Sequence, residues 1–135
     1  MHAMKDYYAI LKLNQDASPG DIRKAYRHLA LENHPDRNPD DPGAEERFKE
    51  IAEAYGVLMD PDKRQVYDQS WHLGAQGQEQ ADFAFSQEEI FRDLFNNPAI
   101  HGAFRELLKE FGRRGLRCDK TFLMRTFMGG KGIFV

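Results

Sequence analysis

One short run, His34-Pro35-Asp36, places two side chains that can do chemistry on either side of a proline. An imidazole beside a carboxylate could act as a general acid–base pair or contribute ligands to a metal ion. Proline disfavours helical dihedral angles in the residue before it, so a preceding helix is expected to stop at about Asn33 or His34. We therefore expect both side chains on a rigid elbow that faces water rather than a core.

Neither catalysis nor metal binding finds support elsewhere in the chain. A dyad of His34 and Asp36 lacks an identifiable nucleophile. His34 and Cys118 lie far apart in the sequence, and no C-x-x-C pair supports a zinc site. We expect no enzymatic activity, no metal site and no cofactor. The remaining structural alternative is a helix end followed by a proline turn.

Two amphipathic patterns flank this run and must position it. Before it, Ser18 is suited to cap a helix with Pro19 at the first position and Asp21 completing a capping box. Apolar residues at helical spacing form one stripe in each pattern: Ile22, Ala25, Tyr26, Leu29 and Ala30 in the first, and Ala44, Phe48, Ile51, Ala52, Tyr55 and Leu58 in the second. Two helices joined by about ten residues are predicted to pack as an antiparallel pair.

Shorter apolar segments border this predicted pair. The second helix should end at Asp60-Pro61, and a third helical pattern covers residues 62–67. Upstream, the run DYYAILKL at residues 6–13 can cover one end of the pair. The predicted fold class is all-α, with an antiparallel helical hairpin, short flanking helices and a small C-terminal helical region.

Residues 6–69 resemble a J domain, the module of the DnaJ co-chaperone family. The matching features, in order, are Tyr7 and Leu11, the run IRKAYR at 22–27, His34-Pro35-Asp36 with Arg37 and Asn38, RFKEIAEAY at 47–55 and DKRQVYD at 62–68. So many matches in the expected order are highly specific. The resemblance implies the helical hairpin described above, with the His-Pro-Asp run at its tip.

The resemblance also implies a partner and a set of binding residues. J domains dock on the ATP-bound form of a DnaK-class, seventy-kilodalton heat-shock chaperone and speed its ATP hydrolysis, which traps a client. By this resemblance Asp36 would bond to a partner arginine, and His34 and Pro35 would fix the loop that presents it. The expected chaperone-binding residues are His34, Pro35, Asp36, Arg23, Lys24, Tyr26, Arg27, Arg37, Asn38, Lys49, Lys63 and Arg64.

This sequence departs from the usual family pattern just before the motif. Glu32 and Asn33 stand where many members have a basic and an aromatic residue, and His28 replaces a frequent basic residue. Glu32 places a negative charge on or near the expected docking face. Affinity or partner choice is therefore expected to differ from that of a generalist J domain.

The composition of the chain indicates where the protein is located and how its domains are arranged. The longest apolar runs are only a few residues and the single cysteine cannot form an internal disulfide, so we expect a cytoplasmic protein with no membrane partner. The predicted domains are a J domain at 1–69, a linker at 70–85 and a helical region at 86–135. With one cysteine, the chain lacks the repeated C-x-x-C-x-G-x-G zinc motif of larger DnaJ proteins.

Helical patterns resume after the predicted linker. Ser86 with Glu89 forms a capping box, Asn97 with Pro98 can begin a second helix, and Asp119 can cap a third. Gly112 or Gly115 is expected to stop the second helix, and the run GGKG at 129–132 the third. We expect the apolar residues of these helices to form a core rather than a ligand pocket. They are Ile90, Phe91, Leu94, Phe95, Ile100, Ala103, Phe104, Leu107, Leu108, Phe111, Phe122, Leu123 and Phe127.

The role of this C-terminal region stays open at the sequence level. It could hold a client, or it could be the main binding module with the J domain as a recruiter. Residues 102–135 carry eight basic and three acidic side chains, which leaves nucleic acid or an anionic surface as an alternative ligand. Because no recognisable nucleic-acid motif is present, we do not expect nucleic acid to be a partner. The apolar faces of the C-terminal helices need a packing partner, because monomers rarely expose large apolar patches. If that partner is the second or third J-domain helix, the C-terminal region could restrain docking of the J domain on its chaperone.

Overall fold

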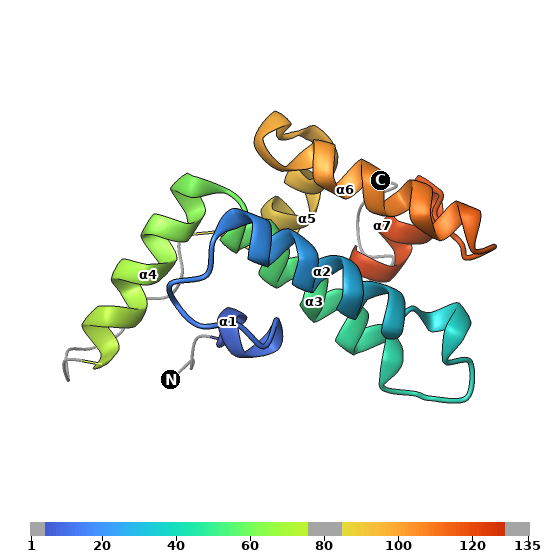
Figure 1. Ribbon diagram of the computed structural model, residues 1–135, viewed down its shortest axis with the longest axis horizontal. Helices are drawn as coiled ribbons and strands as arrows, with labels where there is room; N and C mark the ends of the chain where they lie inside the picture. Colours follow the sequence, from blue (N-terminus) through green and yellow to red (C-terminus); the bar gives the residue numbers. More distant parts are fainter. Residues whose placement is uncertain (1–4, 76–84, 129–135) are drawn as a thin grey trace.

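The described part of the computed structural model, residues 5–75 and 85–128, is all-α (Figure 1). Its helices are α1 (Tyr7–Ile10), α2 (Pro19–Glu32), the short 3-10 helix η1 (Pro35–Arg37), α3 (Ala44–Leu58), α4 (Pro61–Ala75), α5 (Gln87–Asn96), α6 (Pro98–Arg113) and α7 (Lys120–Met128). The predicted fold class is thus confirmed.

Helices α2 and α3 form the predicted antiparallel pair, with η1 at the turn between them (Figure 1). The predicted capping box at the start of α2 is present: Ser18 accepts from the Asp21 amide, and Asp21 accepts from the Ser18 amide. Helix α2 ends at Glu32 with Asn33 as its C-cap, which confirms the boundary expected from Pro35.

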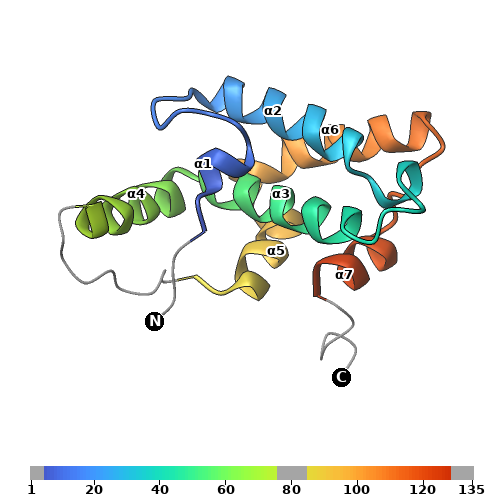
Figure 2. The same cartoon turned by 90° about the horizontal axis from the view of Figure 1, so that it is seen from below.

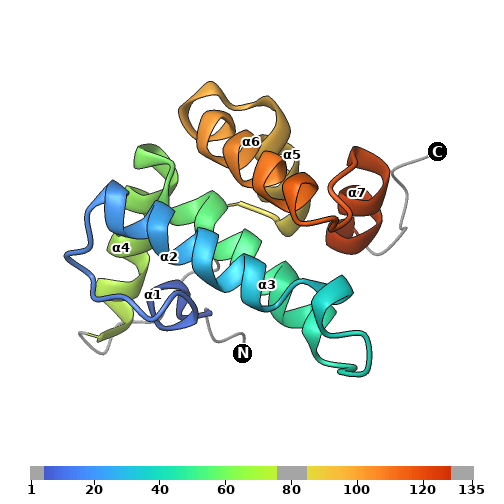
Figure 3. The same ribbon diagram turned by 45° about the vertical axis from the view of Figure 1, so that its right-hand side comes forward.

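Helix α3 lies at the centre of the molecule. Every residue from 51 to 58 is buried, which is far more than one amphipathic stripe can account for. Figures 1 and 3 show the reason: α1 lies on one side of α3, and α5 to α7 lie on the other. A helix covered on two sides has no wide solvent face, so polar residues such as Glu53 need internal partners. Glu53 accepts hydrogen bonds from Tyr7, from Lys5 and from Gln87 of α5.

Local capping rules also build the C-terminal helices as predicted. Ser86 accepts from the Glu89 amide, Asn97 from the Ala99 amide, and Asp119 from the Phe122 amide. Helix α6 ends at Arg113, and Gly115 follows with a φ of 74°, a left-handed conformation that glycine adopts without steric cost. The predicted breaker at 129–132 lies outside the described residues.

These C-terminal helices bury their phenylalanines against the J-domain-like hairpin and one another, as predicted for core residues, except that Phe95 is only half-buried. Helices α5 and α7 pack on α3, and α6 packs on α5 and α2 (Figure 2). Phe91, Leu94, Phe104, Phe111 and Phe127 are each at most 1% exposed. One hydrophobic core therefore joins both halves of the chain.

The chain between the halves is helical for longer than the sequence pattern indicated. Helix α4 runs from Pro61 to Ala75 and so enters the segment predicted as a linker from residue 70. The rest of that segment, to residue 84, lies outside the described residues. No helix among residues 5–75 and 85–128 is long and apolar enough to cross a membrane.

Candidate functional site

The His-Pro-Asp run forms a tight, hydrogen-bonded turn. His34 caps η1: its Nδ1 accepts from the Asp36 amide at 3.0 Å. Two following residues brace the turn against the end of α2. Asn38 donates to the carbonyls of Glu32 and His34 at 2.9 Å, and Arg37 donates to the Leu31 carbonyl at 3.2 Å. These bonds satisfy carbonyls at and after the helix C-terminus, and they hold the backbone of the turn against the end of α2.

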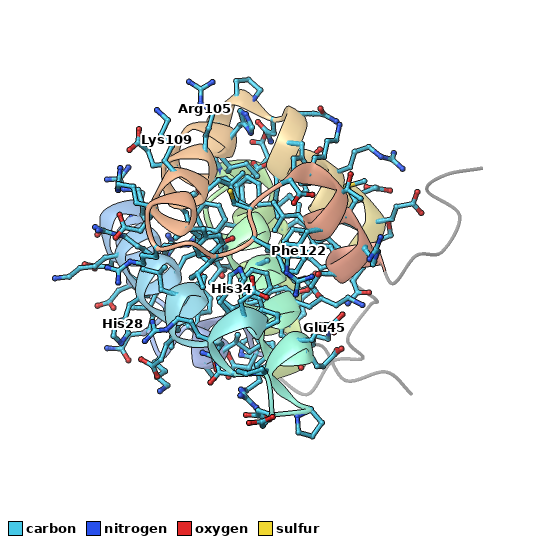
Figure 4. All side chains as sticks on the ribbon, turned by 90° about the vertical axis from the view of Figure 1, so that its right-hand side faces the viewer. His28, His34, Glu45, Arg105, Lys109 and Phe122 are labelled. Atoms are coloured by element: carbon cyan, nitrogen blue, oxygen red, sulfur yellow. The ribbon has the colours of Figure 1, made fainter. Side chains whose placement is uncertain are left out.

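The expectation that His34 faces water is wrong. Its exposed fraction is 0%. The imidazole ring lies among three phenylalanine rings, with centroid distances of 5.1 Å to Phe48, 4.8 Å to Phe111 and 5.4 Å to Phe122 (Figure 4). Phe48 belongs to α3, but the other two come from α6 and α7. Contacts from the C-terminal region thus make the His34 side chain, which was expected to be exposed, part of the core.

Burial also fixes the chemical state of His34. Because Nδ1 accepts the Asp36 N–H, the ring proton must lie on Nε2, which donates to the Arg117 carbonyl at 2.9 Å. Burial lowers the pKa of His34 below 6.5, although the carbonyl of Arg117 and the charge of Asp36 partly oppose this. A neutral imidazole in a fixed tautomer positions the loop and carries no charge itself.

Asp36 is engaged by the same residue. Its carboxylate lies 2.7 Å from Arg117 Nη2 and accepts from Arg117 Nε and from the Arg117 amide, both at 2.9 Å. Hydrogen bonds from the Arg117 side chain are the main reason that the pKa of Asp36 is lowered, and the pKa of Arg117 is raised in return. The turn therefore binds a guanidinium group in two-point fashion.

The basic residues of α2 lie on its exposed face and border a groove. Arg23, Lys24 and Arg27 are exposed. Tyr26 is 2% exposed and stacks on Tyr55 with ring centroids 4.2 Å apart. A groove of about 670 Å³ runs between α2 and α6, lined by these four α2 residues and by Glu106 and Glu110 among others.

Glu110 of α6 gathers three cations at the edge of this groove. It lies 3.3 Å from Arg27 and 3.0 Å from Arg114, and it also pairs with Arg113. The Arg113, Arg114 and Arg27 guanidinium groups lower the pKa of Glu110 to about 2. Part of the positive charge noted in the C-terminal sequence is thus paired with carboxylates.

The other expected binding residues do not gather at the turn. Lys63 is 6% exposed and pairs with Asp60 and with Asp93 of α5. Arg64 donates to the Tyr8 hydroxyl and to the Ala17 carbonyl, on the α1 side of the molecule. The half-buried Lys49 lies one turn into α3. Pro35, Asp36 and Arg37 form η1, with His34 and Asn38 as its caps, whereas the α2 cations lie along the preceding helix.

Arg117 is not among the predicted site residues. Arg117 stands in the connection between α6 and α7, where a basic residue is ordinarily solvated. Its contact with a motif that lies 81 residues earlier depends on how the helices pack, and no spacing rule encodes that packing. The same holds for the pairs of Asp93 with Lys63 and of Glu110 with Arg27, since in each pair the partner lies on another helix.

Comparison with known proteins identifies the hairpin. The DnaJ domain model matches residues 6–68. These residues are a J domain. The match covers α1 to most of α4 and includes the His-Pro-Asp turn.

The relatives of this J domain are chaperones. Chaperone protein DnaJ of Methanosarcina thermophila is 55% identical over 120 residues, which is 87% of this chain and 28% of that protein. Chaperone protein DnaJ of Salinibacter ruber is 63% identical over 70 residues, or 52% of this chain and 18% of that protein. The chain thus spans less than a third of the length of these relatives. The first alignment is longer than the J domain, so similarity continues beyond residue 68.

A solved structure with a J domain also matches. The crystal structure of the J-Trx1 fragment of ERdj5 is 37% identical, covers 62% of this chain and 38% of that chain, and has a TM-score of 0.47.

Proposed function

We propose that this chain is a J-domain co-chaperone that docks on a DnaK-class heat-shock chaperone and stimulates its ATP hydrolysis, so that a client is captured. The observation that carries the proposal is the geometry of Asp36. Held by the His34 cap and the Asn38 brace, its carboxylate accepts a guanidinium at two points in this structure. Such a carboxylate is suited to a partner arginine.

The α2 face adds an electrostatic component to the proposed docking. Arg23, Lys24 and Arg27 are exposed on α2, the helix that leads into the turn. A cluster of cations raises the association rate with an acidic surface and orients the encounter. Glu32 is also exposed there, and its carboxylate lies 2.9 Å from His28 Nε2 on the same helix.

The C-terminal region is proposed to contribute to client capture rather than to bind nucleic acid. Arg113, Arg114 and Arg117 are each paired with a carboxylate, which leaves fewer free cations than the sequence count indicates. Phe91, Phe104 and Phe111 are buried in this arrangement, so their contact with a client requires the helices to move. The expected cytoplasmic location stays a prediction.

The test is the ATPase rate of a DnaK-class partner with the wild-type chain and with Asp36→Asn. We expect the variant to lose stimulation about tenfold or more, because a hydrogen bond to a charged group contributes about 1.5–3 kcal/mol. Asp40→Asn is the matched control, since Asp40 is exposed on the same loop and carries the same charge. Equal stimulation by wild type and Asp36→Asn would remove the proposed function.

A further inference from the structure

Arg117 occupies both chemical groups of the His-Pro-Asp turn at once. Its guanidinium and amide bind the Asp36 carboxylate, and its carbonyl accepts the proton of His34 Nε2. Arg117 also lies over the Phe122 ring, with 4.3 Å between its Cζ and the ring centroid, so its position is fixed from the α7 side as well. An incoming partner arginine cannot make the same bonds to Asp36 while this one is in place.

Other C-terminal residues cover further parts of the proposed docking surface. Glu110 of α6 pairs with Arg27 of α2, and Asp93 of α5 pairs with Lys63 of α4. The Tyr55 hydroxyl, behind the Tyr26 ring, donates to the Ile100 carbonyl of α6 at 2.9 Å. Helices α5 to α7 therefore lie along the α2–α3 pair, with the connection between α6 and α7 at the turn (Figure 3).

The pair between Arg117 and Asp36 is more exposed to solvent than the packing of α5 and α6. The side chain of Arg117 is 56% exposed and that of Asp36 is 25% exposed, so water and salt can weaken the pair. By contrast, Phe91, Leu94 and Phe104 hold α5 and α6 through full burial. Residues 114–119, here called the latch segment, join α6 to α7 through Gly115. A partner has to displace this segment, and it need not unfold α5 and α6.

We propose that the latch segment is an autoinhibitory element in which Arg117 takes the place of the partner's arginine on Asp36. The proposal rests on the proposed function, since it presumes that Asp36 binds a DnaK-class chaperone. A chain with the latch closed does not dock, so its apparent affinity for the partner is reduced by the fraction of molecules that are open. A substitution of Arg117 that weakens its contact with Asp36 must then increase stimulation of the partner's ATPase, whereas a substitution of Asp36 must abolish that stimulation.

The test titrates a DnaK-class partner with the full-length wild type, Arg117→Ala, Arg117→Lys and Arg105→Ala. Arg105→Ala is the matched control, because Arg105 lies on the outer side of α6, away from His34 (Figure 4). We expect half-maximal ATPase stimulation by Arg117→Ala at about three- to tenfold lower concentration than wild type. Arg117→Lys should fall between them, and Arg105→Ala should match wild type. An Arg117→Ala variant that needs as much protein as wild type, or more, overturns the proposal.

A second readout separates failure of the latch from failure of the proposed function. Hydrogen exchange of the His34 Nε2 proton, followed by nuclear magnetic resonance, reports closure without any partner. It should be faster in Arg117→Ala than in wild type and Arg105→Ala, and equal rates in all three overturn the latch. If exchange accelerates as expected but no variant stimulates the ATPase, the proposed function fails, and the autoinhibitory role fails with it. Circular dichroism must show equal helix content in all variants, and Arg117→Lys decides the outcome if Arg117→Ala is not folded.

Discussion

Asp36 and Arg117 meet at 2.7 Å although 81 residues separate them. One lies on the turn after α2, and the other lies on the connection before α7. Their pairing is reinforced by a backbone hydrogen bond and by the burial of His34 beside it. The contact makes the state of the His-Pro-Asp turn depend on the position of the C-terminal helices.

Two glycines test whether α5 packs on α3 as described. A Cβ at Gly56 would lie 2.7 Å from Ile90 Cγ2, so Gly56→Ala forces the helices apart and should destabilise the chain by about 1–3 kcal/mol. Gly102 is also helical, but a Cβ there meets nothing within 4 Å. Gly102→Ala should stabilise by about 0.5–1 kcal/mol through helix propensity.

Urea denaturation of both variants measures these free energies of unfolding. Because the chemical change is the same and both sites are helical, opposite signs isolate the effect of the α3–α5 contact. A Gly56→Ala variant as stable as Gly102→Ala would show that α5 does not pack on α3 in solution.

Phe48 is expected to be a large contributor to stability. It is 1% exposed, and its ring contacts those of His34, Phe111 and Phe127, so it belongs to the core of both halves. Phe48→Ala should reduce the free energy of unfolding by about 3–5 kcal/mol. Leu73→Ala is the control, since Leu73 is 41% exposed and its truncation should cost far less. A loss below about 1 kcal/mol for Phe48→Ala would show that this residue is not core.

The ion pair between Asp93 of α5 and Lys63 of α4 is expected to stabilise the packing of these two helices. Asp93→Asn leaves the buried Lys63 with Asp60 as its remaining carboxylate, so we expect a loss of about 1–3 kcal/mol in the free energy of unfolding. Glu89→Gln removes the same charge from an exposed position of the same helix and should change stability by less than about 0.5 kcal/mol. Equal effects of the two substitutions would mean that the pair with Lys63 contributes nothing measurable.

Acidification should weaken the closed arrangement through His34. Burial lowers the pKa of His34, so the unfolded or open chain binds a proton more readily than the closed one. The contribution of the neutral His34 to the free energy of unfolding is therefore complete above about pH 6.5 and is lost as the pH falls below that value. The charged groups that face His34 are Asp36, Arg37 and Arg117. Asp36 has its pKa lowered from 3.8 and stays ionised throughout this window.

The pH prediction is checked by measuring the free energy of unfolding at pH 7.5, 6.5 and 5.5 for wild type and for His34→Gln. The loss of stability on acidification should be smaller in the variant, because the substitution removes only the contribution of His34 and leaves all other groups unchanged. An identical pH dependence would show that His34 is not protected from protonation by burial.

Much of this fold follows from local rules in the sequence. The caps at Ser18, Ser86, Asn97 and Asp119 are decided by the residue and its neighbours within one turn, and each begins the predicted helix. The end of α2 follows from the steric effect of Pro35 on the residue before it. Such features need no knowledge of distant contacts.

The state of the site does not follow from those rules. His34 is polar and lies off the apolar stripes, so its pattern indicates exposure, yet Phe111 and Phe122 from distant helices cover it. A 3.6-residue period reports one buried face, and it cannot show that α3 receives a second layer from the C-terminal half. The pairing of Arg117 with Asp36 depends on that second layer.

The dependence of docking on Asp36 and its restraint by Arg117 are tested together by one ATPase titration of a DnaK-class partner with wild type, Arg117→Ala and Asp36→Asn. Both substitutions remove the pair between Asp36 and Arg117. Both should loosen closure, but only Asp36→Asn should lose docking. We expect stimulation to be highest with Arg117→Ala, lower with wild type, and close to the unstimulated rate with Asp36→Asn. Stimulation by Asp36→Asn equal to that of wild type would contradict this expectation.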